Sequence, residues 1–138
     1  MHTSTDAGLR RVVVKVGSST LTYPATGQLN LRRIGALATA LADLKNSGIS
    51  PVLVTSGAVA SGMAKLGISE RPADTRSRQA IAAVGQCALM HIYDKMLSEY
   101  GVNVGQILLT KDVIDNPGHR DHAANTFERL LELDRCHT

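Results

Sequence analysis

The first candidate for chemistry in this sequence is Lys15, which interrupts a run of valines and stands just before Gly17 and Ser18. We expect the run to form a buried strand, where an unpaired ammonium group is costly. One interpretation is a lysine that reaches solvent or pairs with a carboxylate. The other is a lysine that contacts a phosphate group, beside a glycine turn whose N–H groups bind anionic oxygens.

A second candidate is the segment Ser56-Gly57-Ala58, which connects an apolar run, residues 51–55, to a helical pattern. The first N–H groups of a helix and its dipole favour an anion at this place. Ser56 could bind a substrate carboxylate, or it could be the N-cap of the helix, and the two roles are compatible. Met63 stands where a P-loop has its lysine, and no GxGxxG sequence is present, so both of those phosphate motifs are excluded.

Other polar residues are weaker candidates. Asp112 and Asp115 follow a third apolar run and could bind Mg²⁺ or a substrate amine, but a solvated loop explains them equally well. Residues 119–122 (His-Arg-Asp-His) are better explained as a solvated loop than as a metal site. We expect Cys87 to be a small buried side chain and Cys136 an exposed thiol, with no disulfide or zinc site.

The elements that must position these residues alternate between strands and helices. Strands are predicted at residues 10–16, 51–55 and 102–109. A first helix is predicted at residues 31–44, with Asn30 as N-cap and Gly48 as stop, and a second from Ala58 to near Gly67. A long helix follows the connector at residues 68–74 and ends at Gly101, and a last helical stripe starts at about Phe127. The apolar stripe of the long helix is predicted to contain Ser77, Ile81, Val84, Ala88, Ile92 and Met96. This order is typical of an α/β fold with a mostly parallel sheet and helices on both faces.

A parallel sheet would bring three segments to one edge. Ligands bind at the carboxyl ends of the strands in such sheets. Residues 15–19, 56–57 and 110–112 would then face one crevice. In this class of fold we expect another strand after the last helix, so we interpret the chain as truncated.

Composition narrows the function classes. The net charge is +3, and one Phe and three Tyr give no platform for stacking bases, so no nucleic-acid partner is expected. No apolar run approaches the roughly 18 residues of a membrane helix. Residues 1–9 are interpreted as a disordered tail rather than a signal peptide, with the cytoplasm as the expected location.

Four segments together resemble the amino acid kinase family, in its glutamate-phosphorylating branch. They are VVKVGSS (residues 13–19), VTSGAVASG (residues 54–62), QAIAAVGQ (residues 79–86) and GQILLT (residues 105–110). The resemblance covers residues 11 to 133. It implies a three-layer α/β/α sandwich and the ATP- and Mg²⁺-dependent conversion of L-glutamate to γ-glutamyl phosphate, for proline synthesis.

The same resemblance implies roles for single residues. Lys15 would contact the transferred phosphate, with Gly17 and Ser18 as the turn beside it. Ser56 would bind glutamate, with Gly57 and Ala58 in the same loop. Mg²⁺ and most of ATP would be bound by a second half of the domain, and no metal ligand is assigned here. One departure is His122, where the family has an asparagine.

The resemblance also sets the domain interpretation. Residues 10–133 would be the N-terminal half of an amino acid kinase domain, and residues 134–138 an atypical tail. Two alternatives stay open: a catalytically inactive fragment of such an enzyme, and a family member with a carbamate-type acceptor. A homo-oligomer is expected, because a sheet edge left unpaired favours self-association.

Overall fold

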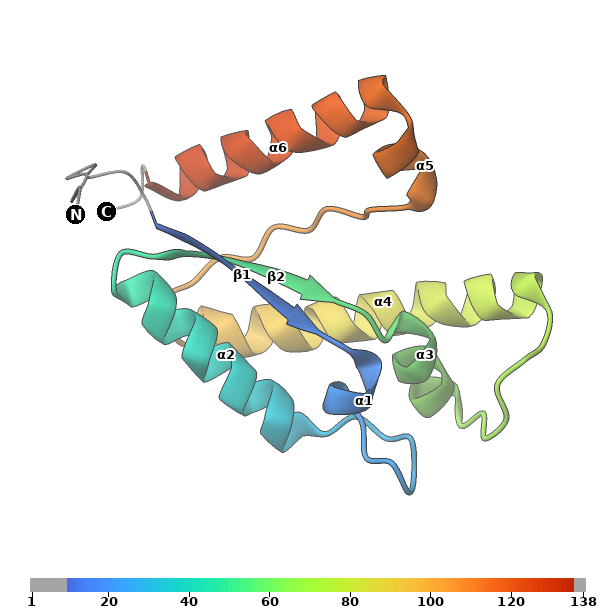
Figure 1. Ribbon diagram of the computed structural model, residues 1–138. Coiled ribbons are helices and arrows are strands. Elements are labelled where there is room, and N and C mark those ends of the chain that lie inside the picture. Colours follow the sequence, from blue (N-terminus) through green and yellow to red (C-terminus); the bar gives the residue numbers. More distant parts are fainter. Residues whose placement is uncertain (1–9, 136–138) are drawn as a thin grey trace, which may run out of the picture. The chain divides into compact units, whose positions relative to one another are not determined.

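The computed structural model describes residues 10–135 and divides the chain into two compact units, with the boundary after Val102 (Figure 1). Each unit is described here by itself. The predicted tail at residues 1–9 lies outside the described residues, and so do residues 136–138, including Cys136. Within residues 10–135, no helix is both long and apolar enough to cross a membrane.

The first unit contains a parallel pair of strands and four helices. In chain order these are β1 (Arg11–Val16), α1 (Ser18–Leu21), α2 (Leu31–Asn46), β2 (Ser50–Thr55), α3 (Ala58–Leu66) and α4 (Thr75–Ser98). The strands pair in parallel with Val14 opposite Leu53 and Val16 opposite Thr55. The α/β class and the parallel pairing predicted from the sequence are confirmed.

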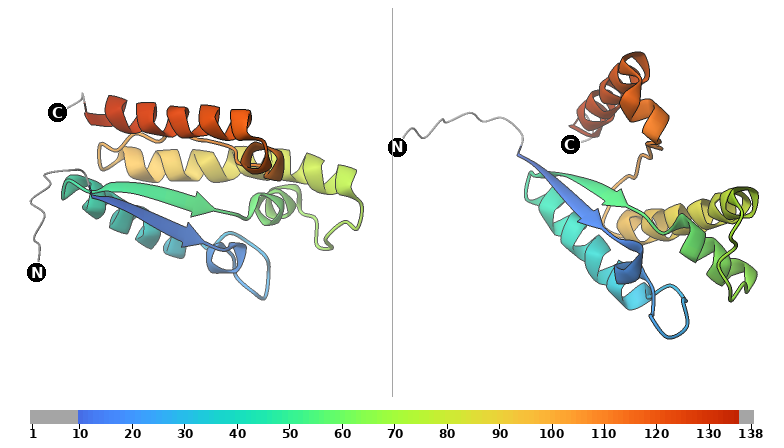
Figure 2. Two further views of the ribbon diagram at one scale, coloured as in Figure 1. Left: turned by 45° about the horizontal axis from the view of Figure 1, so that its top comes forward. Right: turned by 45° about the vertical axis from the view of Figure 1, so that its right-hand side comes forward.

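One face of the strand pair packs on α2 and α4. Val16 from β1, Ile34 from α2, and Leu89 and Tyr93 from α4 form the buried cluster, together with Leu21 of α1. Figure 2 shows the two strands lying across α2 and α4 from two further sides. Burying each of the large aliphatic side chains contributes about 1.5–3 kcal/mol, so this face holds both strands against the helices.

The other face of the pair is exposed, which corrects one expectation. Lys15 is exposed, and so are its neighbours on this face, Val13 (65%) and Val54 (42%). Successive residues of a strand point to opposite faces, and only Val12, Val14 and Val16 turn toward the helices. The prediction that Lys15 lies in a buried strand was therefore wrong.

Local signals set the ends of α2 and α3 as predicted. The Asn30 side chain accepts a hydrogen bond from the Arg33 amide at 3.1 Å and caps α2, and Gly48 follows the end of the helix with φ +82°. Gly67 ends α3 with φ +67°, a conformation that glycine adopts without a steric penalty.

The long helix α4 was predicted, and its apolar stripe was assigned correctly only in part, since Ile92 and Met96 are partly buried against the core but are not its buried residues. The buried residues are Ile81, Gly85, Leu89, Tyr93 and Leu97, so of the predicted set only Ile81 is buried. The true stripe contains a glycine, which does not count as apolar in a periodicity search. Cys87 is an exposed free thiol, contrary to prediction, because it lies outside this stripe.

The second unit consists of an extended segment, residues 103–110, followed by α5 (Lys111–Asp115) and α6 (Pro117–Arg135). The prediction of a third strand at residues 102–109 was wrong, because β1 and β2 are the only strands among the described residues. Both named elements of this unit are helices, so residues 103–109 have no strand within it to pair with. Gly105 faces Leu130 of α6 instead, where a β-carbon would be 3.3 Å away.

The start of α6 is a further difference. The sequence predicts a turn at residues 116–118 and a helical stripe only from Phe127, yet α6 begins at Pro117. Proline is well suited to the first position of a helix, because its fixed φ is helical and its missing N–H has no partner there anyway. Asn116 completes the start by accepting hydrogen bonds from the amides of Gly118 and His119 at 3.1 and 3.4 Å.

Candidate active site

Two turns meet where the parallel strands end. Pairing continues past the strands, since the Ser56 amide donates to the Val16 carbonyl at 3.3 Å. The chain then passes from β1 through Gly17 into α1, and from β2 through Ser56 and Gly57 into α3. A β-carbon on Gly57 would be 3.5 Å from the Ser18 β-carbon, so the two turns are in contact. The structure thus brings together the two sets of site residues predicted in this unit.

Gly57 has a conformation that explains its residue type. Its φ is +111° and its ψ 11°, in a region that side chains with a β-carbon rarely occupy. Gly57 occupies the N-cap position of α3, and its carbonyl accepts a hydrogen bond from the Ser61 amide at 2.8 Å. Ser56 is exposed and is not the N-cap, so the simple capping role considered for it was wrong.

The amides at the start of α3 make this end of the unit favourable for an anion. The first N–H groups of an α-helix have no acceptor within the helix, and the helix dipole adds positive potential. Ala58 is the first residue of α3, so its amide faces the same region as the Ser56–Gly57 turn. The predicted binding of a carboxylate or phosphate at residues 56–58 fits this local geometry.

Gly17 and Ser18 form the facing turn. Gly17 has an extended backbone (φ −80°, ψ 160°) and its carbonyl accepts from the Thr20 amide at 3.1 Å. No atom lies within 4 Å of a β-carbon placed on Gly17, so space is open on that side. Both residues are exposed, which leaves their backbone accessible to a ligand.

Lys15 lies at the last position but one of β1, opposite Val54. Its side chain is exposed, so burial gives no argument for a bound phosphate. What remains is position: Lys15 is two residues before Gly17, and its partner Val54 is two residues before Ser56. Lys15 is therefore close to both turns, to the first along β1 and to the second through its partner Val54 on β2.

Sequence reasoning missed the residues that hold α3 in place. A β-carbon on Gly85 of α4 would overlap the Ala58 carbonyl oxygen and the Gly62 amide nitrogen. A β-carbon on Gly62 would likewise overlap the Ile81 carbonyl oxygen. The backbones of α3 and α4 therefore touch at two glycines. The available signal was the occurrence of Gly62 and Gly85 inside patterns that otherwise predict helices, where glycine is unfavourable.

Tyr93 of α4 contacts the end of β2 from the side of the sheet that packs on the helices. The residue is 2% exposed, and its hydroxyl lies 3.5 Å from Oγ1 of Thr55, a long contact. Burial raises the pKa of the Tyr93 phenol, and the hydrogen bond with Thr55 opposes that effect in part. The phenol thus stays protonated under ordinary conditions and places a polar group next to Thr55.

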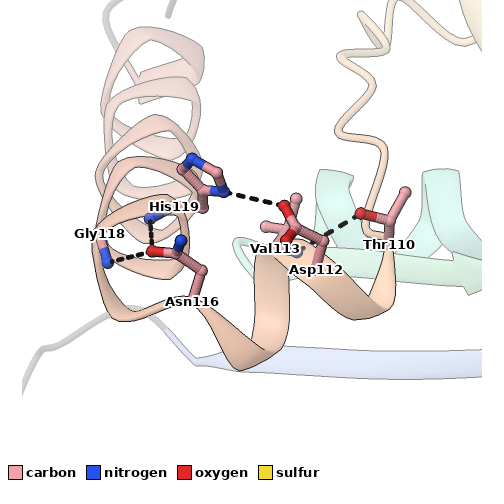
Figure 3. Close-up of polar contacts among 6 residues, drawn as sticks. All are labelled: Thr110, Asp112, Val113, Asn116, Gly118 and His119. Carbon is pink, nitrogen blue, oxygen red and sulfur yellow. Dashed lines mark hydrogen bonds and ion pairs between the residues drawn. The ribbon is translucent and has the colours of Figure 1, made fainter.

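The other candidates lie in the second unit. The Thr110 side chain caps α5 by accepting from the Val113 amide at 3.4 Å, and Asp112 Oδ2 contacts His119 Nδ1 at 3.0 Å (Figure 3). Asp112 and His119 are 75% and 54% exposed, so this pair is a surface contact of small energetic weight. That residues 110–112 share a crevice with the other two segments stays a prediction.

No metal centre is evident in the described part of the chain, where no group of three His, Cys, Asp or Glu side chains could hold an ion. A hollow of about 490 Å³ lies in the first unit between the loop at residues 24–28 and α3, with Ala60, Met63 and Ala64 in its wall. None of the six predicted site residues lines it. The strand-end turns, not this hollow, are therefore the candidate site.

Paired parallel strands that end in facing turns are typical of α/β domains, which bind ligands at the carboxyl ends of their strands. The sequence profile of the amino acid kinase family matches residues 10–135. The chain belongs to the amino acid kinase family.

Individual relatives narrow the likeness to glutamate 5-kinases. The chain is 50% identical over 123 residues to the glutamate 5-kinase of Clostridium perfringens, a match that covers 89% of this chain and 45% of the relative. The glutamate 5-kinase of Symbiobacterium thermophilum is 50% identical over 122 residues (88% and 46%), and that of Enterococcus faecalis 47% over 125 residues (91% and 46%). The chain thus spans just under half the length of these relatives.

Proposed function

We propose that this chain carries the glutamate- and phosphate-binding half of a glutamate 5-kinase site, which transfers the γ-phosphoryl group of ATP to the side-chain carboxylate of L-glutamate. The observation that carries the proposal is the contact between the Gly57 and Ser18 turns at the ends of the parallel strands. Identity of about half to named glutamate 5-kinases, across nearly the whole chain, supports the choice of substrate.

The reaction needs positioning more than proton transfer. A carboxylate oxygen of glutamate attacks the γ-phosphorus, the bond from that phosphorus to the bridging oxygen of ADP breaks, and γ-glutamyl phosphate and ADP result. The nucleophile is already ionised at neutral pH, so no general base is required. What remains is to align the two reactants and to neutralise the charge that spreads over the phosphoryl oxygens.

One turn binds glutamate, and the other turn, with Lys15, binds the phosphoryl group. Ser56, with the amides of Gly57 and Ala58, binds glutamate at the start of α3. Gly17 and Ser18 present open backbone to the phosphoryl group. Lys15 contributes the positive charge that this group requires, from the position on β1 two residues before Gly17.

This chain offers a place for the phosphate end of ATP but no evident ligands for Mg²⁺ among its described residues. The Gly17–Ser18 turn fits the end of a triphosphate, because small residues let oxygens approach the backbone. The described residues offer no set of three metal-ligating side chains. We therefore assign Mg²⁺ and the rest of ATP mainly to the part of the relatives that this chain does not cover, and no step is routed through the ion.

Binding and turnover can be tested separately on the purified chain. Calorimetry with L-glutamate should show binding that Ser56→Ala weakens by about tenfold, the loss expected for one hydrogen bond to a charged group. Lys15→Ala should leave glutamate binding nearly unchanged and weaken binding of inorganic triphosphate, whereas Lys65→Ala, which removes an exposed lysine at the far end of α3, should change neither. Equal effects of the two lysine variants would remove the assigned role of Lys15.

A second candidate is a half-site that binds without turning over, since the match covers just under half of the glutamate 5-kinase relatives. Acyl phosphate formed from ATP and glutamate can be trapped with hydroxylamine as the hydroxamate. A hydroxamate signal from the 138-residue chain alone would exclude the inactive alternative. Binding of glutamate without that signal would support it, and displacement of glutamate by carbamate would point to the other acceptor.

A further inference from the structure

Helix α4 contacts the two residues that flank the Ser56–Gly57 turn, Thr55 and Ala58. On the near side, the Tyr93 hydroxyl lies 3.5 Å from Thr55 Oγ1, at the last residue of β2. On the far side, Gly85 lies against the backbone of Ala58, the first residue of α3. The turn between these points has backbone hydrogen bonds but no side chain at Gly57 to anchor it, so its position also depends on how its two flanks are held.

The Gly85 contact is a backbone contact that any side chain would block. A β-carbon at this position would overlap the Ala58 carbonyl oxygen and the Gly62 amide nitrogen, and would come within 2.8 Å of the Ala58 carbonyl carbon. Backbone atoms cannot move aside as the end of a flexible side chain can. Any larger residue would therefore displace the start of α3, and Gly57 would move with it because it is bonded to Ala58.

The Tyr93 contact reaches Ser56 through one further hydrogen bond. The Thr55 hydroxyl donates to the Ser56 carbonyl at 3.2 Å. Either hydroxyl can be the donor in the contact between Tyr93 and Thr55. The ring of Tyr93 is buried in the core, with the residue 2% exposed. Its hydroxyl is therefore held in a fixed position next to Thr55.

We propose that Gly85 and Tyr93 are positioning residues, which set the Ser56–Gly57 turn against the Gly17–Ser18 turn without touching either substrate. The inference rests on the proposed function, in which the first turn binds glutamate and the second the phosphoryl group. Displacing a reactant by about 1 Å can cost a factor of about 100 in rate, so such supports matter even when they lie outside the site.

The chain supplies a matched control for each residue. Gly35 is a glycine inside α2 with no atom within 4 Å of a β-carbon, so Gly35→Ala introduces the same methyl group without a clash. Tyr100 also contacts a threonine hydroxyl, that of Thr39 at 3.1 Å, away from the turns. Tyr100→Phe therefore removes one phenolic hydroxyl from a tyrosine–threonine contact, as Tyr93→Phe does, but at an exposed position. The two test variants are Gly85→Ala and Tyr93→Phe.

Three measurements on the full chain decide the matter. They are the L-glutamate dissociation constant from calorimetry, the nuclear Overhauser contact between the Gly57 α-protons and the Ser18 β-protons, and the thermal unfolding midpoint. Gly85→Ala should weaken glutamate binding by about tenfold or more and abolish the Gly57–Ser18 contact, because a displaced turn loses its alignment. Tyr93→Phe should weaken binding several-fold and reduce the contact, while both controls stay within twofold of the unchanged chain.

A merely structural role would give another pattern. Tyr93→Phe and Tyr100→Phe would then lower the unfolding midpoint but leave glutamate affinity and the Gly57–Ser18 contact unchanged, and this would overturn the inference. An unaltered contact in folded Gly85→Ala would do the same. Should Gly85→Ala fail to fold, Tyr93→Phe decides alone. If the unchanged chain binds no glutamate, the proposed function fails, and the Gly57–Ser18 contact still tests the positioning role.

Discussion

Gly57 and Ser18 lie in contact across the ends of the two strands, with a β-carbon on Gly57 placed 3.5 Å from the Ser18 β-carbon and 3.8 Å from Cδ1 of Leu21. These separations are ordinary van der Waals distances, so space does not exclude a methyl group at this position. The backbone conformation does, because φ is +111°. The contact therefore depends on the freedom of glycine rather than on its small size.

Gly57→Ala should accordingly destabilise the chain through backbone strain. We expect the free energy of unfolding to fall by about 1–3 kcal/mol, the usual cost of holding a side-chain-bearing residue in such a region. Glutamate affinity should fall as well, because the turn would relax away from Ser18. Denaturant unfolding and calorimetry measure the two effects.

Gly67→Ala is the matched control for that prediction. Gly67 ends the same helix with φ +67°, and no atom lies within 4 Å of a β-carbon there. The variant should cost about 1 kcal/mol from left-handed strain and leave glutamate affinity unchanged. Equal losses of affinity in both variants would mean that only the stability of α3 matters, not the shape of the turn.

A second prediction concerns the crossing of α3 and α4. A β-carbon on Gly62 would overlap the Ile81 carbonyl oxygen and lie 2.7 Å from its Cγ2. Gly62→Ala should lower the free energy of unfolding by about 3 kcal/mol, the upper range for overpacking. Gly35→Ala, which meets no atom within 4 Å in α2, should raise it by about 0.5–1 kcal/mol through helix propensity. A stabilising Gly62→Ala would show that the helices do not approach so closely.

The sequence could predict those parts of the fold and site that rest on local signals. The run of valines, Asn30, Gly48 and Gly67 mark strand and helix ends by their own preferences, and the sequence also predicts both strand-end turns. The contact between these turns follows from parallel pairing, which the alternation of strands and helices also predicts.

What the sequence could not predict depends on neighbours. The exposure of Lys15 follows from one face of the strand pair lying open, which no property of the lysine reveals. A strand at residues 102–109 exists only with a pairing partner. The buried stripe of α4 was predicted only in part, because Gly85 is buried for its lack of a side chain and a search for apolar periodicity does not count glycine.

A third prediction uses an unsatisfied group. Ser61 in α3 is 1% exposed, and within residues 10–135 its hydroxyl has no hydrogen-bond partner. A buried unpaired hydroxyl costs about 1–3 kcal/mol, and alanine is also the better helix former. Ser61→Ala should therefore raise the free energy of unfolding by about 1 kcal/mol, measured by denaturant titration. A destabilised variant would show that the hydroxyl has a partner in solution.

The last prediction concerns acid stability at the start of α4. Asp74 caps this helix, and its Oδ1 accepts from the Ser77 amide at 2.8 Å. Two hydrogen bonds from Ser77 lower the pKa of the Asp74 carboxyl from the ordinary 3.8. The bond from the Ser77 backbone has the larger effect, and the bond from its side chain the smaller one. Because the folded state holds the proton more weakly, the carboxylate adds stability that is complete above pH 3.8 and is lost as the pH falls through the lower folded value.

Asp74→Asn isolates this contribution from the other carboxylates. Asparagine caps a helix about as well as aspartate but does not titrate. Both proteins should lose stability in acid, and the advantage of the aspartate form should shrink as the pH falls below 3.8. Thermal unfolding followed by circular dichroism at a series of pH values measures the difference. A gap that stays constant, or widens in acid, would mean that the Ser77 amide does not stabilise the charged form of Asp74 in solution.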